Sequence, residues 1–479
     1  MTSAKTLNAK NLAALGAARL AAIVLEITAG DVQAKRRLRL ELASQAGGDE
    51  VAAQVRKRLV SIGKSRSFVS WRKMRGLQQD LETQLRAVTE LIAPTQPAEA
   101  FDLLWRFAAL APSLYERCDD SNDGISYIIS QVIAALGALA PIAKMPSLAL
   151  AERIYEALCS NSYGQYDDLI PLLAEPLGRD GLGYLKTKFE SMTPALQLDL
   201  PDAERRVIGI SSRGVVYEDD AERRAQLRTI QSALTQIADA AGDVDSYIAI
   251  YADEDRKNPA IAARIADRLL VAGRAEEAYG ALALAQPMRR KGGHWPDWDR
   301  VKVNVLDALG HLSDAQNLRW DLFEHDLAAD WLRQYLKKLP DFEDMEAEER
   351  AIAYAGGFPD FHRALFFLLE WPALPAANQL ILARCAQIDG THYELLSTAA
   401  SALEYAHPLA ATLVLRAMID FALENARHKR YRHAARHLKA CESLARKIED
   451  YGEHKSHTAY LANIKSAHKQ KLGFWNALA

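Results

Sequence analysis

Three residues near the C-terminus carry side chains of the kind that binds zinc. His433, His437 and Cys441 follow one another at intervals of four residues, so on a helix they lie within about 80° of one another. Imidazole and thiolate at this spacing can bind zinc, which is the basis of a metal-dependent enzyme hypothesis. The same helix carries Ala434 and Leu438 beside Cys441 as a packing stripe. A structural or solvated role for the two histidines is the favoured interpretation, because no motif specifies a fourth ligand.

Other motifs for cofactors and catalysis are incomplete. Gly178, Gly181 and Gly183 match neither the phosphate-binding P-loop nor the dinucleotide fingerprint, and they are expected to mark turns between helices. Residues 119–124 resemble the start of a calcium loop, but the twelfth position is Ser130, where a bidentate glutamate is required. The sequence contains no HExxH or GxSxG motif. We therefore expect no cofactor and no catalytic residue.

A basic segment close to the N-terminus combines cations with aromatic rings. Its candidate residues for contact with nucleic acid or another anion are Arg56, Lys57, Arg58, Lys64, Arg66, Arg72, Lys73 and Arg75. Phe68 and Trp71 lie among them, and cations interleaved with aromatic side chains suit phosphate contact and base stacking. The alternative interpretation is a solvated helix face, with the two aromatic residues packed in the core.

Charge is distributed unevenly along the chain. Residues 1–92 hold 16 lysines and arginines against 8 acidic residues, and residues 427–479 hold 12 against 4. The formal net charge of the 479 residues is -3, so the segment between them is acidic. These opposite charges can bring the termini back onto the middle of the chain or recruit an anionic partner. The overall pI of about 6.5 is low for a nucleic-acid-binding domain.

Cysteine usage and hydropathy indicate a cytoplasmic protein. The cysteines are Cys118, Cys159, Cys385 and Cys441. None belongs to a CxxC or CxC pair, and such sparse thiols fit buried positions in a reduced compartment. Residues 8–30 predict one amphipathic helix rather than a signal peptide. The apolar run 128–143 is shorter than the roughly 20 residues that cross a bilayer, so it predicts a buried helix and no membrane association.

Helix signals dominate the whole chain. Asp31 is a typical N-cap for a helix ending near Gly47, and acidic residues at 49 and 50 suit the first turn of the next one. Further helices are predicted at residues 78–92, 97–116, 124–140 and 147–159, with prolines at their borders. The aromatic-rich residues 358–371 predict a helix with a broad apolar face in the core. The expected fold class is all-α.

Two turns in the second half share a spacing of glycine and alanine. Gly273 precedes Ala278 and Gly310 precedes Ala315 by five residues each, and the two glycines are 37 positions apart. Residues 429–438 form a third copy that keeps the alanine. Glycine ends the first helix in a left-handed conformation, and the small alanine lets the second helix approach closely. The pattern is typical of tetratricopeptide-like helical hairpins and predicts an α-solenoid with a concave groove.

Residues 206–217 break the helical pattern. β-branched residues flank a Ser-Ser-Arg-Gly turn, which predicts a short β-hairpin or an irregular linker. We therefore expect a solenoid in two parts. These are an N-terminal helical domain, residues 1–200, and a tetratricopeptide-like repeat domain, residues 218–479, joined by a linker at residues 201–217.

Several segments together resemble a known family. They are residues 117–121, 161–164, 407–411 and 431–438, His468, and Phe474 with Trp475. They are similar to a bacterial family of uncharacterised all-helical proteins, known only as a domain of unknown function. The C-terminal part also resembles helical regions behind SWIM-type zinc fingers, but the CxC and CxH ligands are absent and the zinc role does not transfer. The resemblance implies an all-helical fold and a bacterial cytoplasmic setting, without an activity.

The leading hypothesis for function is a non-enzymatic scaffold that binds a protein or peptide in its concave groove. A nucleic-acid-associated protein is the alternative, using the basic N-terminal and C-terminal helices. A metal-dependent enzyme is the second alternative. It ranks last because catalytic sites need convergent polar groups, and no motif in the sequence shows them.

Overall fold

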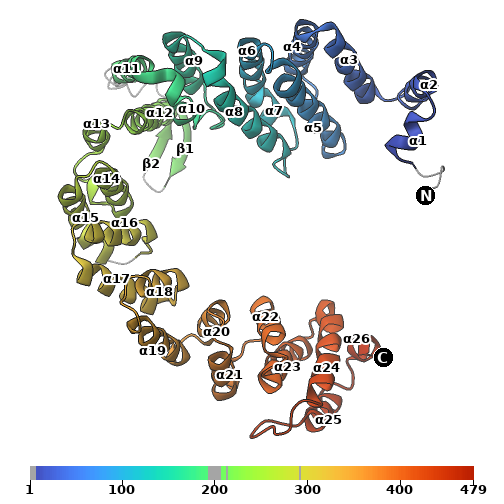
Figure 1. Cartoon of the computed structure of the whole chain (residues 1–479), viewed down its shortest axis with the longest axis vertical. Coiled ribbons are helices and arrows are strands. Elements are labelled where there is room, and N and C mark those ends of the chain that lie inside the picture. Colours follow the sequence, from blue (N-terminus) through green and yellow to red (C-terminus); the bar gives the residue numbers. More distant parts are fainter. Residues whose placement is uncertain (1–6, 193–205, 212–213, 291–292, 479) are drawn as a thin grey trace. The chain divides into compact units, whose positions relative to one another are not determined.

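The computed structural model describes residues 7–192, 206–211, 214–290 and 293–478. Contacts divide the chain into two compact units, Met1–Arg256 and Lys257–Ala479. Both units are helical, and the strands among the described residues form a single two-stranded hairpin in the first unit (Figure 1). The expected all-α fold class is therefore confirmed.

The first unit consists of helices that pack mainly on near neighbours in sequence. Its elements are α1 (Ala9–Ala13), α2 (Ala17–Ile27), α3 (Val32–Ala46), α4 (Gly48–Lys64), α5 (Trp71–Arg86), the π-helix η1 (Ala87–Ile92), α6 (Pro97–Ala108), α7 (Ala111–Arg117), α8 (Gly124–Ala143), α9 (Ser147–Cys159), α10 (Leu169–Leu172), α11 (Ala174–Met192), β1 (Val207–Ser211), β2 (Gly214–Tyr217), α12 (Glu218–Ala241) and α13 (Val244–Ala249). The 3₁₀ turn η4 (Asp255–Lys257) spans the boundary with the second unit.

The second unit continues the helical pattern to the C-terminus. Its elements are α14 (Pro259–Val271), α15 (Ala275–Arg290), α16 (Pro296–Ala308), α17 (Leu312–Asp326), α18 (Ala329–Leu336), α19 (Glu343–Gly357), α20 (Phe361–Glu370), α21 (Leu374–Ala383), the 3₁₀ turn η5 (Cys385–Gln387), α22 (Tyr393–Leu403), α23 (Pro408–Glu424), the 3₁₀ turn η6 (His428–Arg430), α24 (Tyr431–Ala445), α25 (His457–Ala467) and α26 (Leu472–Leu478).

The N-terminal helices differ from the prediction at one glycine. Residues 8–30 do not form one helix, because Gly16 adopts a positive φ of 79° and separates α1 from α2. The next helix begins as predicted: the Asp31 carboxylate accepts the backbone N–H groups of Gln33 and Ala34 at the start of α3. An N-cap side chain of this kind satisfies N–H groups that lack a partner in the helix.

Helix α8 is longer than its sequence predicted. It continues through Pro141 to Ala143. Gly137, four positions before the proline, has no Cβ, and this leaves room for the Leu172 side chain. The helix has 20 residues, and 18 consecutive residues within it have a mean hydropathy of 1.8, so by length and composition it could cross a membrane, unlike the 16-residue run considered above. Most of its isoleucine and leucine side chains are buried against other helices of the first unit, as in a core helix.

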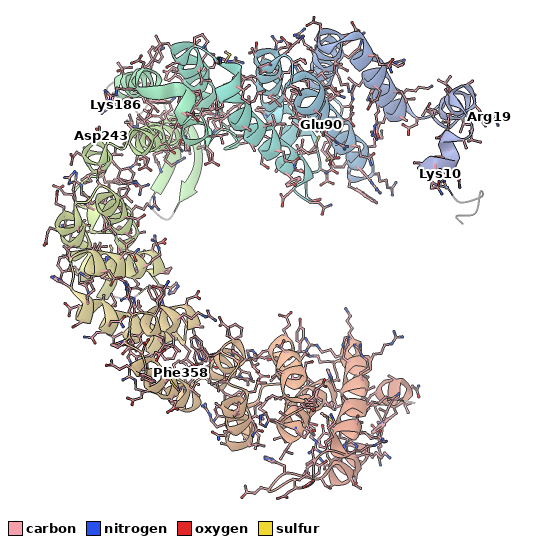
Figure 2. All side chains as sticks on the ribbon, in the orientation of Figure 1. Lys10, Arg19, Glu90, Lys186, Asp243 and Phe358 are labelled. Carbon is pink, nitrogen blue, oxygen red and sulfur yellow. The ribbon has the colours of Figure 1, made fainter. Side chains whose placement is uncertain are left out.

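The hairpin occurs where the sequence predicted it, but it does not divide the chain. Strands β1 and β2 pair antiparallel, while residues 201–205 and 212–213 of the expected linker lie outside the described residues. Helix α11 packs on α12 across this segment. The Lys186 ammonium lies 3.9 Å from the Asp243 carboxylate and donates to the Ser246 hydroxyl at 2.9 Å (Figure 2). The hairpin therefore lies inside the first unit, and the division by contacts falls at Arg256.

Three helix ends in the second unit share one hydrogen-bonding pattern. After α14, the left-handed Gly273 donates its N–H to Leu270, and the next N–H bonds to Leu269. The same pair of bonds closes α16 at Gly310 and α23 at Ala426, which also have positive φ angles. This arrangement satisfies carbonyl groups at the end of a helix. The left-handed glycines predicted from sequence are present at both positions, and Ala426 takes the same role in the third turn.

Replacing Ala426 with glycine is expected to raise the free energy of unfolding by about 0.5–1 kcal/mol. Alanine has a φ of 49° at this position, and left-handed backbone costs a residue with a Cβ about 1–2 kcal/mol, part of which is offset by the greater freedom of unfolded glycine. Urea denaturation followed by circular dichroism measures the change. The reverse substitution, Gly273→Ala, is expected to destabilise the protein through the backbone angle alone. A Cβ at this position would meet no atom within 4 Å, but alanine would have to adopt a φ of 75°. A lower midpoint for Ala426→Gly would contradict this account.

Candidate functional site

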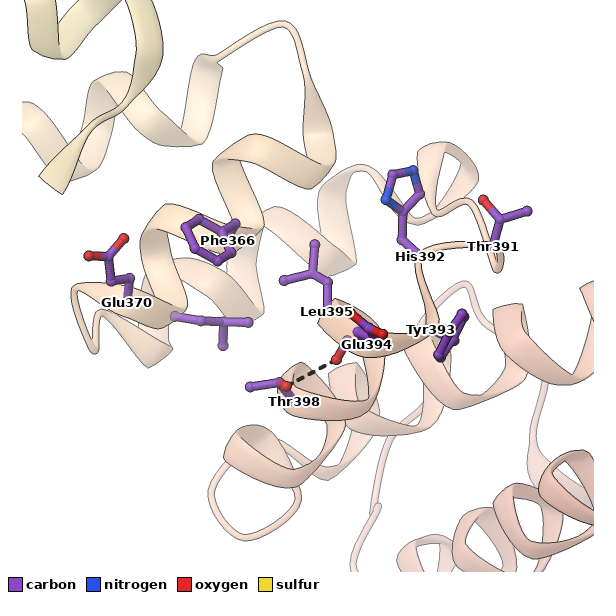
Figure 3. A pocket seen from close by; sticks show the side chains of 9 residues that line it. Phe366, Glu370, Thr391, His392, Tyr393, Glu394, Leu395 and Thr398 are labelled. Carbon is purple, nitrogen blue, oxygen red and sulfur yellow. Dashed lines mark hydrogen bonds between the residues drawn. The ribbon is translucent and has the colours of Figure 1, made fainter. Parts of the chain in front are cut away.

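An open groove lies between α20 and the start of α22 in the second unit. Its volume is about 700 Å³, and its lining residues are Phe366, Leu369, Glu370, Thr391, His392, Tyr393, Glu394, Leu395 and Thr398. Phe366 from α20 and Leu395 from α22 lie on opposite sides of the opening in Figure 3. A volume of this size is within the range of about 300–1,000 Å³ that is usual for ligand sites.

The alternation of exposed and buried side chains on α20 creates the apolar wall of this groove. Phe366 is 57% exposed, whereas Phe367 is fully buried and its ring centre lies 5.3 Å from that of Phe323. Asp360 starts the helix by accepting two backbone N–H groups, which holds the pKa of its carboxyl below the usual value. The segment 358–371 therefore has the broad apolar core face that its sequence predicted, but Phe366 lies outside that face, because the helix has more large side chains than one face can bury.

Two stacked imidazole rings lie beside the groove at the start of α22, where His392 is one of the lining residues. The rings of His362 and His392 have centres 4.1 Å apart and are inclined by 18°. The Asp389 backbone N–H donates to His362 Nε2 at 3.0 Å, so this nitrogen carries no proton. Burial and the neighbouring His392 lower the pKa of His362. His362 therefore favours its neutral form.

The remainder of the groove is bordered by acidic and aromatic side chains. Glu370 lies 3.5 Å from the Arg333 guanidinium, and Glu394 has no ion pair among the described residues. Arg430 lies over the Tyr393 ring, 4.2 Å from its centre. The groove thus offers apolar surface flanked by carboxylates, a combination suited to a segment with apolar and basic side chains.

A second cavity of about 480 Å³ in this unit was not found by sequence reasoning. Arg416 on α23 is 5% exposed, donates to the Lys455 carbonyl at 2.7 Å and lies 4.4 Å from the centre of the Tyr460 ring. The Tyr460 hydroxyl donates to Asp420 at 2.7 Å, and burial raises the pKa of that carboxyl. Because these residues come from separate segments, their spacing gave no signal.

The same cavity also brings a thiol beside an imidazole. Cys385 Sγ lies 4.0 Å from His454 Nδ1, and both residues line the cavity. The two are 69 residues apart in sequence and belong to no short motif. Their side chains are half-buried.

The three candidate zinc ligands do not form a metal site in the structure. Cys441 is fully buried, its thiol contacts the Thr412 carbonyl oxygen at 3.9 Å, and burial raises its pKa to about 12. His433 is exposed and bonds with Arg436 at 2.7 Å, while half-buried His437 has its pKa lowered first by burial and then by these two neighbours. Within the described ranges, no group of three or more His, Cys, Asp or Glu side chains has the arrangement of a metal site.

Protonation of three histidines is expected to destabilise the second unit in acid. Burial is the largest cause that lowers the pKa of His362, His437 and His457. Each binds fewer protons folded than unfolded, so stability that is present above about pH 6.5 is lost as the pH falls. The raised pKa of Asp420 acts in the opposite direction.

Urea midpoints at pH 7.5 and pH 5.5 measure this effect, and the midpoint should be lower at pH 5.5. His437→Gln should reduce the difference. His294→Gln should leave it unchanged, because His294 is exposed and forms no ion pair among the described residues. A midpoint that rises toward pH 5.5 would contradict the prediction.

The segment that resembles a calcium loop and the glycines near residue 180 have different local structures. In residues 119–124, the Asp120 carboxylate accepts the backbone N–H groups of Ile125 and Ser126 and so caps α8. Of the glycines near residue 180, only Gly178 interrupts the helix, with a φ of 54°. Gly181 and Gly183 lie within α11 rather than in a turn.

The basic residues of the first unit fall into paired and unpaired groups. Arg56 forms an ion pair with Glu99, and Arg58 forms one with the buried Asp80. The others are exposed and form no ion pair in the part of the chain that the structure describes: Lys57, Lys64, Arg66, Arg72, Lys73 and Arg75.

The two aromatic residues among these cations are exposed rather than packed in the core. Phe68 is 66% and Trp71 is 67% exposed, and the Arg72 guanidinium lies 5.3 Å from the centre of the Trp71 ring. Between α4 and α5, the backbone of Val69 bonds to Arg117 and Asp119 at 2.8 and 3.1 Å. This bridge holds the loop against the end of α7, and the core interpretation of the two rings is wrong.

Comparisons with known proteins identify a family and no activity. No curated protein matches the chain. One similar solved structure is a circular tandem repeat protein with novel repeat topology and enhanced subunit contact surfaces. It is 15% identical over 95% of this chain and 94% of that chain, with a TM-score of 0.12, too low to support an argument about arrangement.

The match to a protein family covers almost the whole chain. A family model matches residues 2–477. This confirms the resemblance to a domain of unknown function, whereas the resemblance of the C-terminal part to regions behind SWIM-type zinc fingers stays a prediction. The chain belongs to the family of unknown function DUF6880.

Proposed function

We propose that this protein is a non-enzymatic scaffold of the bacterial cytoplasm whose groove between α20 and α22 binds a peptide segment of a partner protein. The observation that carries the proposal is the exposed ring of Phe366, which borders a groove of about 700 Å³ opposite Leu395. A large aromatic side chain at the edge of a groove is a typical anchor for a partner's apolar residue.

The helix ends support an extended binding surface as the wider context. Ala278, Ala315 and Ala434 are all buried where the second helix of each predicted hairpin begins. Close approach at each turn is what a tetratricopeptide-like α-solenoid requires, and stacked helix pairs of this kind offer long surfaces for partners. The proposed scaffold is therefore an α-solenoid of this kind.

The chemistry of the groove indicates one kind of occupant. Glu370 and Glu394 flank the apolar wall, and both are exposed. A segment with a leucine or aromatic anchor followed by lysine or arginine would bury its anchor against Phe366 and place its cation near these carboxylates. The proposed occupant is therefore an amphipathic basic peptide.

A display library of peptides of about twelve residues tests this proposal with the full-length chain as bait. We expect the enriched peptides to combine an apolar anchor with basic residues and to bind at least tenfold more weakly to Phe366→Ala. Phe342→Ala is the matched control, because Phe342 belongs to the same unit, is exposed and lies outside the groove. Enriched peptides that bind Phe366→Ala and the wild type equally would overturn the proposal.

Exposure of Phe68 and Trp71 favours nucleic-acid association as a second candidate function. Both rings are available for base stacking, which contributes about 1–3 kcal/mol per base, and six unpaired cations of the first unit surround them in sequence. The basic C-terminal helices α24 and α25 belong to this hypothesis too.

Binding of a fluorescent single-stranded oligonucleotide tests the second candidate. Phe68→Ala with Trp71→Ala should weaken binding by about tenfold or more, and affinity should fall steeply as salt rises. Leu148→Ala is a control with an exposed apolar residue elsewhere in the same unit. Affinity that does not respond to salt or to loss of the two rings would reject this candidate.

A further inference from the structure

A small basic cavity lies between α3, α4 and α5 in the first unit. Its volume is about 190 Å³, and its lining residues are Arg36, Arg39, Leu40, Gln54, Lys57, Arg58, Ser61 and Gln84. Four of these residues carry a positive charge, and none carries a negative charge. Sequence reasoning noted Lys57 and Arg58 as anion candidates but did not connect them with the arginines of α3.

One buried carboxylate orients two of the four cations. Asp80 Oδ2 accepts from Arg36 Nη1 at 3.0 Å and from Arg58 Nε at 2.8 Å. Arg39 and Lys57 are exposed and have no ion pair among the described residues. Asp80 therefore neutralises one positive charge and fixes the geometry, while the surroundings of the cavity keep an excess of three.

The buried amide of Gln84 supplies a second, independent observation. Gln84 is 1% exposed and lines the cavity. Its Nε2 donates to Asp80 Oδ1 at 3.2 Å, which leaves Oε1 as a buried acceptor with no hydrogen-bond partner. A buried acceptor of this kind is costly unless a ligand or water donates to it.

We propose that this cavity binds the phosphate group of a small hydroxyl-bearing molecule. Arg39 and Lys57 would contact the phosphate oxygens, with Arg36 and Arg58 held beside them by Asp80. Guanidinium and ammonium groups form their strongest hydrogen bonds with such charged oxygens. A hydroxyl of the same molecule would donate to Gln84 Oε1.

The dimensions of the cavity limit the ligand. At about 190 Å³ it is smaller than the sites of drug-sized molecules, which occupy about 300–1,000 Å³. A sugar phosphate suits this space better than a dinucleotide. The site does not depend on the groove proposed above, because it lies in the other unit.

Isothermal titration of the full-length chain with ribose 5-phosphate, inorganic phosphate and ribose at constant ionic strength tests the proposal. We expect ribose 5-phosphate to bind more tightly than inorganic phosphate, and ribose alone not to bind. Arg39→Gln with Lys57→Gln should weaken ribose 5-phosphate at least tenfold. Arg37→Gln is the matched control, because Arg37 belongs to the same helix but lines a different depression, and it should change affinity less than twofold.

Several results would overturn the inference. The first is that ribose 5-phosphate binds no more tightly than inorganic phosphate. The second is that Arg39→Gln with Lys57→Gln binds ribose 5-phosphate as tightly as the wild type does. The third is that Arg37→Gln loses as much affinity as this double variant. Circular dichroism of each variant shows whether it is folded. Displacement of ribose 5-phosphate by a single-stranded oligonucleotide would assign the cavity to a nucleic-acid backbone instead. Retention of ribose 5-phosphate binding in Phe68→Ala with Trp71→Ala would support a separate small-molecule site.

Discussion

Asp80→Ala is expected to lower the free energy of unfolding of the first unit by about 3 kcal/mol. The side chain is 5% exposed and holds Arg36 and Arg58, whose side chains are 33% and 22% exposed. Removing one partner of a buried ion pair costs about 3–5 kcal/mol, and partial solvation of the arginines favours the lower end of that range. Without Asp80, two neighbouring guanidinium groups would repel each other and Gln84 would lose its acceptor.

Urea denaturation of the full-length chain measures this loss, with Glu99→Ala as the control. Glu99 pairs with Arg56 at a more exposed position, where an ion pair contributes about 0–1 kcal/mol. Added phosphate should recover part of the stability of Asp80→Ala, because a bound anion would replace the missing negative charge. Similar midpoints for Asp80→Ala and Glu99→Ala would show that the buried carboxylate has no special role.

Alanine substitution of two adjacent phenylalanines on α20 should change the free energy of unfolding by very different amounts. Phe367→Ala is expected to destabilise the second unit by about 3–5 kcal/mol, because the ring is fully buried between Phe323 and Trp371 and its removal leaves a cavity. Phe366→Ala should change stability by less than about 0.5 kcal/mol, as is usual for exposed positions.

The pair also separates binding from folding. Phe366→Ala should lose peptide binding with an unchanged urea midpoint, which shows that the groove and not the fold is affected. Phe367→Ala, in contrast, should lower the urea midpoint. If Phe366→Ala destabilises the chain as much as Phe367→Ala, then Phe366 is part of the core and not an anchor for a partner.

Local signals in the sequence were sufficient for the helix ends. The Asp31 cap and the left-handed glycines at 273 and 310 each depend on a few consecutive residues, and the structure has them. The predictions of one unbroken helix over residues 8–30 and of a helix that ends before Pro141 were wrong. An isolated glycine or proline near a helix end is compatible with more than one local structure, and the packing around it decides which one forms.

The candidate sites were harder to predict because they combine distant segments. Sequence patterning gave Phe68 and Trp71 a choice between core and surface, and the bridge of Val69 to α7, which helps to fix the loop, joins residues about fifty positions apart. Arg416, His454 and Cys385 meet from three segments with no common period. Similarly, the basic cavity needs α3, α4 and α5 to pack before its cations become neighbours.

The preference of each helix for near neighbours in sequence has a kinetic consequence. Pairs such as α14 with α15 and α23 with α24 form within a short stretch of chain, so little loop-closure entropy opposes them. Local contacts of this kind favour rapid folding. Because the chain also divides into two compact units, fluorescence of tryptophans in different units should report unfolding transitions that do not coincide.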